Sequence, residues 1–201
     1  MKKIVLATGN RGKVAEISAL LKHLSLDIVP QSEFGFEEAE ETGLTFVENA
    51  IIKARHAAEL TGLPALADDS GLEVDALDGA PGIWSSRFAG LEANSDDNVD
   101  KLLLELSGLP EQQRSARFQC VIVFMSHAKD PTPLICQGTW EGRILFERRG
   151  DKGFGYDPVF YVPDHDCASA ELTADIKNQI SHRGQALAKL VTALTTQLTH
   201  E

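Results

Sequence analysis

The first stretch of the sequence with residues suited to chemistry is "TGNRGK", residues 8–13, directly after the apolar run "IVLA". Its glycines would let backbone N–H groups approach an anion, a following helix N-terminus would add a positive dipole end, and Lys13 adds a point charge. The spacing matches neither the Walker A pattern nor the dinucleotide-binding fingerprint, because Gly9 and Gly12 are too close together and Lys13 is followed by Val14. By itself the stretch fits an anion site or a plain strand-to-helix turn.

A second polar stretch, "LADDSGLEV" at residues 66–74, places two carboxylates after an apolar run. We expect a strand to end at Asp68 and Asp69 and a Ser-Gly turn to follow. Strand ends are where open α/β sheets bind ligands, and successive residues of a strand point to opposite faces. One of the two aspartates is therefore expected to meet a ligand while the other supports it. The alternative is an Asx-type turn with both carboxylates in water.

An acidic cluster, "EFGFEEAEETG" at residues 33–43, precedes a helix whose start is marked by the capping box Thr45–Glu48. A solvated loop is its default interpretation, but a hard divalent cation prefers carboxylate oxygens from more than one segment. Within the helix, Asn49 and Lys53 are four residues apart and share a face, for which an exposed polar stripe is the simpler interpretation.

A glycine-rich stretch, "GDKGFGYDPVF" at residues 150–160, holds two aromatic residues between glycines. Phe154 and Tyr156 could form a stacking surface for a base. The alternative is a hairpin that returns both rings to the core.

The stretch "ISHRGQAL", residues 180–187, begins the last expected helix, with Ser181 as N-cap. His182 and Arg183 would lie in its first turn, where a cation opposes the helix dipole. Arg183 there suits an incoming anion or hydrogen-bond acceptor, and a solvent-exposed arginine is the alternative.

The elements that must position these residues are helices alternating with short strands, followed by a pair of longer strands. This pattern predicts an α/β fold with a mixed sheet, in a single domain over residues 1–201 with one core that can divide into two lobes. The expected helices cover about 12–24, 45–60, 95–106 and 181–198, and the expected strands 2–8, 26–29, 64–68, 117–127 and 132–147, the last two as an antiparallel hairpin.

Composition excludes several classes of function. With 201 residues, 43% of them hydrophobic, and a formal net charge of -11, the chain is an ordinary globular sequence and a poor candidate for binding nucleic-acid polymers, which need clustered cations. Cys120, Cys136 and Cys167 are scattered without metal-ligand spacing, which is typical of reduced thiols in the cytoplasm. No apolar run is long enough for a membrane span.

Taken together, "TGNRGK", "DDSGLEV", "GAPGIWSSR", "GFGYDPVF" and "SHRGQAL" occur in an order and spacing that resembles the inosine triphosphate pyrophosphatase family, the bacterial dITP/XTP pyrophosphatases in particular. The resemblance extends from "KIVLATGN" through "EETGLTFVENAIIKARHAA" to the last helix, with tolerant differences such as Trp84 where tyrosine is usual.

The resemblance implies an enzyme that hydrolyses deaminated purine nucleoside triphosphates (ITP, dITP, XTP) to the monophosphate and pyrophosphate with Mg²⁺. It also implies a long mixed β-sheet with helices on both sides, two lobes flanking a nucleotide cleft, and a homodimer.

By the same resemblance, Asp69 is expected to act as general base and metal ligand, Glu41 as second metal ligand, and Lys13 as a cation that neutralises charge on the triphosphate. On chemical grounds, Lys53 would join Lys13 in stabilising the charge that builds on the phosphates. The residues expected to bind substrate are Thr8, Gly9, Asn10, Arg11, Gly12, Lys13 and Ser70 for the triphosphate, and Phe154, Gly155, Tyr156, Asp157, Lys177, His182 and Arg183 for the base. We expect donors of His182 and Arg183 to select the 6-oxo group of hypoxanthine over the 6-amino group of adenine. A nucleotide-binding module without turnover, another phosphoanhydride hydrolase and a nucleotidyltransferase remain the alternatives.

Overall fold

The structure, a computed structural model, describes residues 2–22 and 26–198. The described chain forms two compact units. Unit 1 contains the residues up to Asp69, Cys120–Gly138 and the residues from Arg183 onward, and unit 2 contains Ser70–Gln119 and Thr139–His182.

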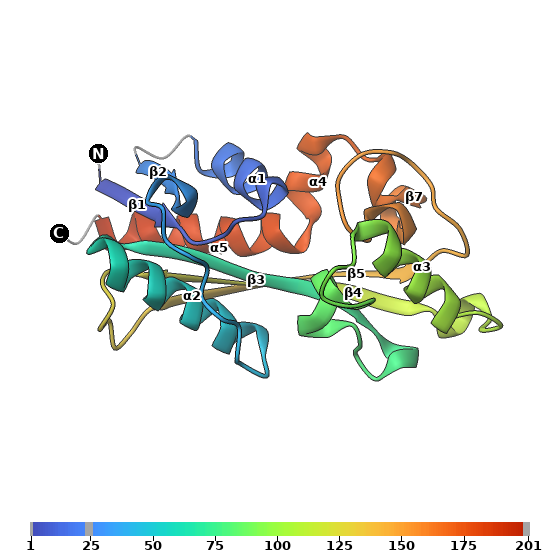
Figure 1. The fold of residues 1–201 in the computed structure, drawn as a ribbon. Coiled ribbons are helices and arrows are strands. Elements are labelled where there is room, and N and C mark those ends of the chain that lie inside the picture. The colour runs from blue at the N-terminus through green and yellow to red at the C-terminus, as the bar shows by residue number, and fades with distance from the viewer. Residues whose placement is uncertain (1, 23–25, 199–201) are drawn as a thin grey trace. The chain divides into compact units, whose positions relative to one another are not determined.

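Strands from both units belong to one seven-stranded sheet of order β2-β1-β3-β4-β5-β6-β7 (Figure 1). Strand β1 pairs in parallel with β2 and β3, whereas β6 pairs antiparallel with β5 and β7, so the predicted mixed sheet is confirmed. The strands are β1 (Lys2–Leu6), β2 (Leu26–Pro30), β3 (Ala65–Val74), β4 (Ser115–Met125), β5 (Leu134–Ile144), β6 (Phe160–Val162) and β7 (Cys167–Ala168).

The helices follow the predicted pattern, with one addition. They are α1 (Arg11–Leu21), α2 (Phe46–Thr61), α3 (Ser95–Glu105), α4 (Ala174–Ile180) and α5 (His182–Leu198). The sequence did not predict α4, β6 or β7, because elements this short carry too few residues to show a period. Part of the helix expected at 12–24 falls on residues 23–25, which lie outside the described residues.

In unit 1, helices cover both faces of the sheet, as predicted. Ile4 and Leu6 of β1 belong to a buried cluster with apolar residues of α1 and α5, while Val5 and Ala7 belong to a second cluster with the alanines of α2. This alternation follows from the two-residue period of a strand, and Figure 1 shows α1 and α5 on one side of β1 and α2 on the other.

Unit 2 has a core of its own. Residues of α3 pack there with an aromatic group in which Phe118 lies 4.6 Å and Trp140 lies 5.1 Å from Phe160, measured between ring centroids.

The expected end of a strand at Asp68 and Asp69 is wrong, because β3 continues to Val74. Both carboxylates are buried, at 0% and 6% exposure, so the Asx-turn alternative is wrong as well. The strand continues because Leu72 and Val74, two residues apart, are buried in the core of unit 2, while nearby cations compensate the aspartates.

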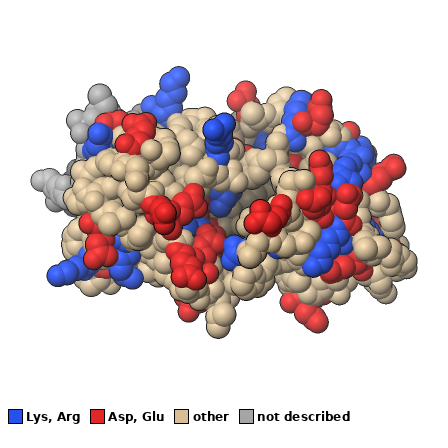
Figure 2. Space-filling view, in the orientation of Figure 1, with Lys and Arg blue, Asp and Glu red and all other residues tan. Residues whose placement is uncertain are grey.

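The surface carries charged side chains of both signs (Figure 2). On the face shown in Figure 2, acidic and basic side chains are interspersed. Within the described ranges, no helix combines the length and the apolar character that a membrane span requires.

Candidate phosphate and metal site

The stretch "TGNRGK" forms the connection from β1 to the N-terminus of α1. Asn10 caps this helix, its Oδ1 accepting the Lys13 N–H at 3.1 Å, and the Asn10 N–H donates to Thr8 Oγ1 at 3.3 Å. The end of the exposed Glu38 side chain lies against Gly9, since a Cβ atom at Gly9 would lie 1.8 Å from Glu38 Oε1 and would require this carboxylate to move. The connection therefore offers a capped helix N-terminus, beside which the acidic loop packs.

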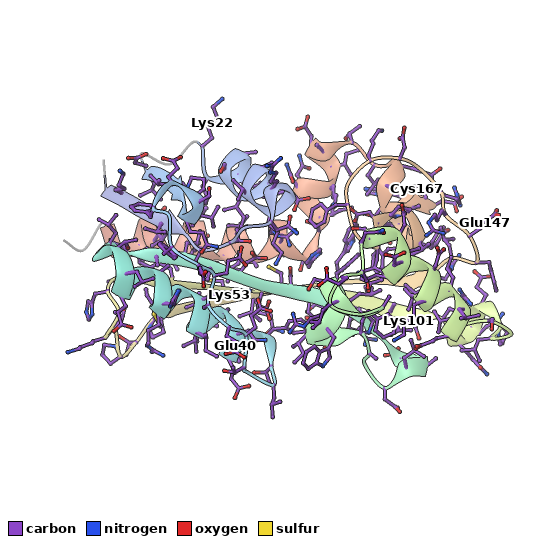
Figure 3. All side chains as sticks on the ribbon, viewed as in Figure 1. Lys22, Glu40, Lys53, Lys101, Glu147 and Cys167 are labelled. Atoms are coloured by element: carbon purple, nitrogen blue, oxygen red, sulfur yellow. The ribbon has the colours of Figure 1, made fainter. Side chains whose placement is uncertain are left out.

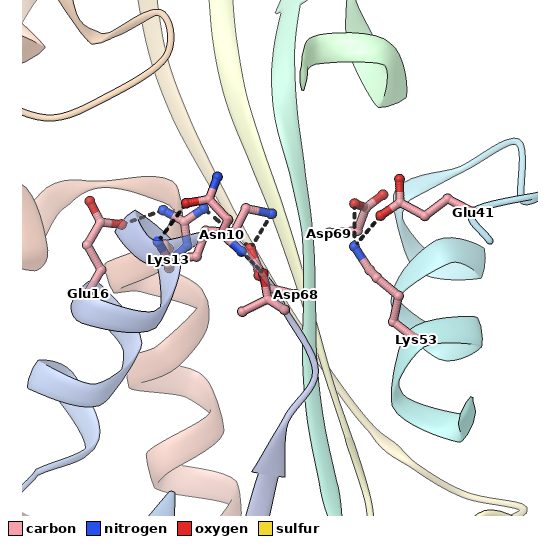
Figure 4. Close-up of polar contacts among 9 residues, drawn as sticks. Asn10, Lys13, Glu16, Glu41, Lys53, Asp68 and Asp69 are labelled. Carbon is pink, nitrogen blue, oxygen red and sulfur yellow. Dashed lines mark hydrogen bonds and ion pairs between the residues drawn. The ribbon is translucent and has the colours of Figure 1, made fainter. Parts of the chain in front are cut away.

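Lys13 and Asp68 form the first of two charged groups beside β3. Asp68 Oδ2 lies 3.1 Å from Lys13 Nζ and 3.3 Å from Arg183 Nη2, and Arg183 Nη1 lies 2.5 Å from Glu16 Oε2 (Figure 4). Burial alone would raise the pKa of Asp68, but Lys13 and Arg183 outweigh it and hold this pKa well below its usual range. The two cations and two carboxylates balance in charge.

The second group lies on the other side of β3 and is centred on Lys53, which extends from α2 towards the sheet (Figures 3 and 4). Its Nζ lies 2.8 Å from Asp69 Oδ1 and 2.7 Å from Glu41 Oε1. The prediction that Asp68 and Asp69 face opposite ways is confirmed. One ammonium faces two carboxylates, so this group carries an excess negative charge.

Asp69 is the least satisfied member of the second group. Its Oδ2 is buried and has no hydrogen-bond partner among the described residues. Burial raises the pKa of Asp69, and the opposing effect of Lys53 does not cancel this rise. A carboxylate with a raised pKa and an unpaired oxygen can accept a proton or bind a cation.

The donor set suits a particular kind of metal site. Among the described residues, no cluster of three or more His, Cys, Asp and Glu side chains could hold a metal ion. Asp69 and Glu41 are only two carboxylates, but Mg²⁺ is commonly held by one or two carboxylates together with water and phosphate oxygens of a substrate. The residues present therefore fit Mg²⁺ on a phosphate rather than a metal cage made of protein alone.

The interpretation of Asn49 and Lys53 as an exposed stripe is wrong. Their exposed fractions are 0% and 9%, and they lie on the same inward face of α2 as Ala50, Ala54 and Ala57. The cause is tertiary: Lys53 finds two carboxylates supplied by distant segments, which offset the cost of burying its charge.

In unit 2, Asp157 organises the glycine-rich stretch. Its Oδ2 accepts from Lys177 Nζ at 2.7 Å and from the Phe154 N–H at 2.8 Å, and its Oδ1 accepts from Ser169 Oγ at 2.8 Å. Lys177 Nζ also lies 5.0 Å from the centroid of the half-buried Phe154 ring. Asp157 thus holds Phe154 and Lys177 together.

The two aromatic residues of this stretch have different environments. Tyr156 returns to the core, where its hydroxyl donates to the Ser85 carbonyl at 2.8 Å and burial raises its pKa. Phe154 keeps part of its ring exposed, and Gly155 lies between the two. A stacking surface in this stretch can therefore use Phe154 but not the Tyr156 ring.

The start of the last helix is confirmed at His182, directly after Ser181. The His182 ring stacks on Phe118, with 4.7 Å between centroids and 12° between planes. The solvent-exposed alternative for Arg183 is wrong, because this side chain is 2% exposed.

The sequence did not predict that Glu16 pairs with Arg183, and it did not predict which residues pair with Asp68. Glu16 and Arg183 are far apart in the chain, and no motif marks Glu16. Ser70 follows Asp69 on β3, while Arg11 and Gly12 open α1, with the Arg11 side chain exposed.

The fold and the site define an α/β protein with a capped helix N-terminus, a buried lysine and two carboxylates that fit a phosphate and a divalent cation. A sequence model of the Ham1 family matches residues 4–193, and the chain belongs to this family.

The chain is 61% identical over 199 residues to a dITP/XTP pyrophosphatase of Vibrio cholerae, covering 99% of this chain and 100% of that protein. Among solved structures, it is similar to a HAM1 protein from Coxiella burnetii, with a TM-score of 0.91, 56% identity and coverage of 98% of this chain and 100% of the other. It is also similar to the Staphylococcus aureus Ham1 protein, with a TM-score of 0.87, 40% identity and the same coverage.

Proposed function

We propose that this protein is a pyrophosphatase that hydrolyses deaminated purine nucleoside triphosphates, such as dITP, ITP and XTP, to the monophosphate and pyrophosphate. The observation that carries the proposal is the group of Asp69, Lys53 and Glu41, with its excess negative charge and the unpaired Asp69 Oδ2. The relative from Vibrio cholerae named dITP/XTP pyrophosphatase, identical at 61% of positions, supports the choice of substrate.

In this proposal the triphosphate binds where residues 8–13 present backbone N–H groups and Lys13. Lys13 and Lys53 stabilise the charge that develops on the phosphates, an effect commonly worth about 3 kcal/mol per donor. Asp68 orients Lys13 and stays ionised, because its two cations hold its pKa low. In place of the expected contact with the base, we assign Arg183 to the support of Asp68, because its Nη1 and Nη2 pair with Glu16 and Asp68 and the side chain is buried.

Asp69 acts as the base that accepts a proton from the attacking water at Oδ2. The pKa of Asp69 is raised above that of an ordinary aspartate and so lies closer to pH 7, which favours proton acceptance. Asp69 and Glu41 would hold Mg²⁺, which would supply charge neutralisation on the phosphates.

Recognition of the base is proposed for unit 2. Phe154 offers a partly exposed ring, Lys177 lies over the same ring, and His182 lies in the first turn of α5. Donors among these groups would pair with the 6-oxo group of hypoxanthine or xanthine and face the 6-amino group of adenine unpaired. Stacking on Phe154 would bind any purine.

The product of the reaction separates this function from its alternatives. Purified protein is incubated with MgCl₂ and each of dITP, ITP, XTP, dATP and dGTP, and nucleotides and phosphates are quantified. We expect pyrophosphate and monophosphate in equal amounts from dITP, ITP and XTP, and at least about 100-fold lower kcat/KM for dATP. Release of orthophosphate, transfer of the nucleotide to an acceptor, or binding without turnover would contradict the proposal.

We further propose that the protein works as a cytoplasmic homodimer on free nucleotides. Sedimentation velocity should give a species of twice the chain mass, and cell fractionation should recover the protein with cytoplasmic markers. A monomer throughout the micromolar range would contradict the first point, and recovery with membranes the second.

A further inference from the structure

Asn49 is a buried polar residue for which the proposed reaction gives no role. It is fully buried on α2, one turn before Lys53 and on the same face of the helix. Its Oδ1 accepts the Gly43 N–H at 2.8 Å, but its Nδ2 is buried and has no hydrogen-bond partner among the described residues. A buried donor without an acceptor destabilises a fold, and one that persists commonly serves a ligand, an ion or a water molecule.

The orientation of this amide is fixed by its neighbour. Because the Gly43 N–H can only donate, the Asn49 atom facing it must be the oxygen, which leaves Nδ2 on the opposite side. Gly43 also packs tightly, since a Cβ atom there would lie 2.6 Å from Glu48 Cβ and 2.7 Å from Asn49 Oδ1. Rotation of the amide to pair Nδ2 elsewhere would leave the Gly43 N–H without an acceptor.

The contact with Gly43 also bears on Glu41, two residues earlier. Glu48 fastens the same segment, its Oε2 accepting from the Leu44 N–H at 2.9 Å and from Thr45 Oγ1 at 2.8 Å. Asn49 and Glu48 thus fix the chain just beyond Glu41, and Glu41 reaches Lys53 Nζ at 2.7 Å. Asn49 therefore acts on the charged group through the backbone of the acidic loop.

We infer that Asn49 is a further residue of the phosphate site, with two tasks. Its Oδ1 positions the Glu41 segment, and its Nδ2 donates a hydrogen bond to a phosphate oxygen of the bound nucleoside triphosphate. A phosphate oxygen suits a buried amide donor because it is an anionic acceptor that arrives only with substrate. This inference rests on the proposed function for the identity of the ligand.

Two substitutions separate the two tasks. Asn49→Asp keeps an oxygen for the Gly43 N–H but replaces the donor with a second oxygen and adds a negative charge, whereas the neutral Asn49→Leu removes both groups. We expect Asn49→Asp to lower kcat/KM for dITP by about 10- to 100-fold without raising the Mg²⁺ concentration needed for half-maximal rate. Asn49→Leu should lower kcat/KM at least as much and also raise that Mg²⁺ concentration.

Asn98 offers a matched control on α3. It is also a buried helical asparagine whose Oδ1 accepts a loop N–H, from Ala89 at 2.7 Å, but its Nδ2 is satisfied by the Ser86 carbonyl at 3.1 Å. Asn98→Asp should lower Tm while leaving kcat/KM within about twofold, because its lost donor served the fold.

A measurement on the wild-type protein is independent of how the variants fold. The side-chain amide of Asn49 is followed by ¹⁵N NMR while an α,β-imido analogue of dITP is added with MgCl₂. We expect a downfield shift of an Asn49 amide proton on binding, and a smaller change for Asn98.

The outcomes distinguish the inference from the function on which it rests. If the analogue binds and shifts the Asn49 amide but wild-type protein releases no pyrophosphate from dITP, the proposed function fails and the inference stands. An unshifted Asn49 amide in the bound state, or Asn49→Asp with kcat/KM within twofold of wild type, overturns the inference even if the enzyme is active.

Discussion

The pKa values of two adjacent aspartates of β3 shift in opposite directions, because the two side chains face opposite sides of the strand. Asp68 meets Lys13 and Arg183, which hold its pKa low, while burial of Asp69 outweighs Lys53 and raises its pKa. Two carboxylates whose pKa values differ in this way can take different roles, one as a fixed negative charge and the other as a proton acceptor.

Replacing Asp69 tests its role as the base. Asp69→Asn keeps the shape of the side chain but removes the charge, so kcat for dITP should fall by about 10²- to 10⁴-fold. The circular dichroism spectrum should stay that of wild type. A kcat within tenfold of wild type, measured as pyrophosphate release, would remove Asp69 from this role.

The raised pKa of Asp69 predicts how rate depends on pH. The base must be ionised, so kcat/KM should rise with pH through this pKa and fall as acid protonates the carboxylate. Because Lys53 lowers the pKa of Asp69, Lys53→Met should move the acid limb of the profile to higher pH, beyond any overall loss of rate. An acid limb at the same pH in both proteins would assign it to another group.

Lys13 is proposed to act on the phosphate tail. Lys13→Ala should therefore weaken binding of the imido analogue of dITP by about tenfold or more and leave dIMP within about twofold, as measured by calorimetry. Equal losses for both ligands would make Lys13 a structural residue paired with Asp68.

At the scale of elements, the Asp68 group ties three elements of unit 1 together. Asp68 belongs to β3, Lys13 and Glu16 to α1, and Arg183 to α5. A fully buried carboxylate between two cations stabilises this arrangement only while all partners are present.

Removing Asp68 should therefore weaken the fold as well as the reaction. Asp68→Ala should lower the free energy of unfolding by about 3–5 kcal/mol, because it leaves Lys13 and Arg183 facing each other. The control is Asp75→Ala, which breaks a more exposed pair with Arg117 at 2.8 Å and should cost about 1 kcal/mol or less. Urea unfolding measures the free energy of unfolding of both variants. Equal losses would contradict the larger contribution of the Asp68 group to stability.

At the scale of the whole molecule, the net charge of -11 sets which anions the protein can bind. Its local cations can hold one small polyanion, but counterion release along a polymer needs cations over an extended surface. On the face shown in Figure 2, basic side chains lie scattered among acidic ones and form no extended basic surface.

We therefore expect the protein not to bind nucleic-acid polymers. Fluorescence anisotropy of a labelled single-stranded oligonucleotide should not change with added protein at 0.1 M salt. Binding that weakens steeply as salt increases would reveal a basic surface outside the face in Figure 2.

The sequence by itself determined the class of fold and most elements. Local signals were sufficient for α2, where Thr45 caps the N-terminus as predicted, and Gly62 in the left-handed conformation ends the helix close to the expected position. The sequence also predicted that Asp68 and Asp69 face opposite ways, because that follows from the two-residue period of a strand.

Only the tertiary structure decided which polar residues are buried and what they meet. From the sequence, Asn49 and Lys53 are interpreted as an exposed polar stripe, and a strand is expected to end at Asp68 and Asp69. Both interpretations follow from the cost of burying a polar or charged group that has no partner. Those partners come from other segments of the chain, as Glu41 of the preceding loop does for Lys53 and the much more distant Glu16 does for Arg183. Local sequence patterns do not show such pairings, so the raised pKa of Asp69 and the orientation of the Asn49 amide follow only from the packing of the elements.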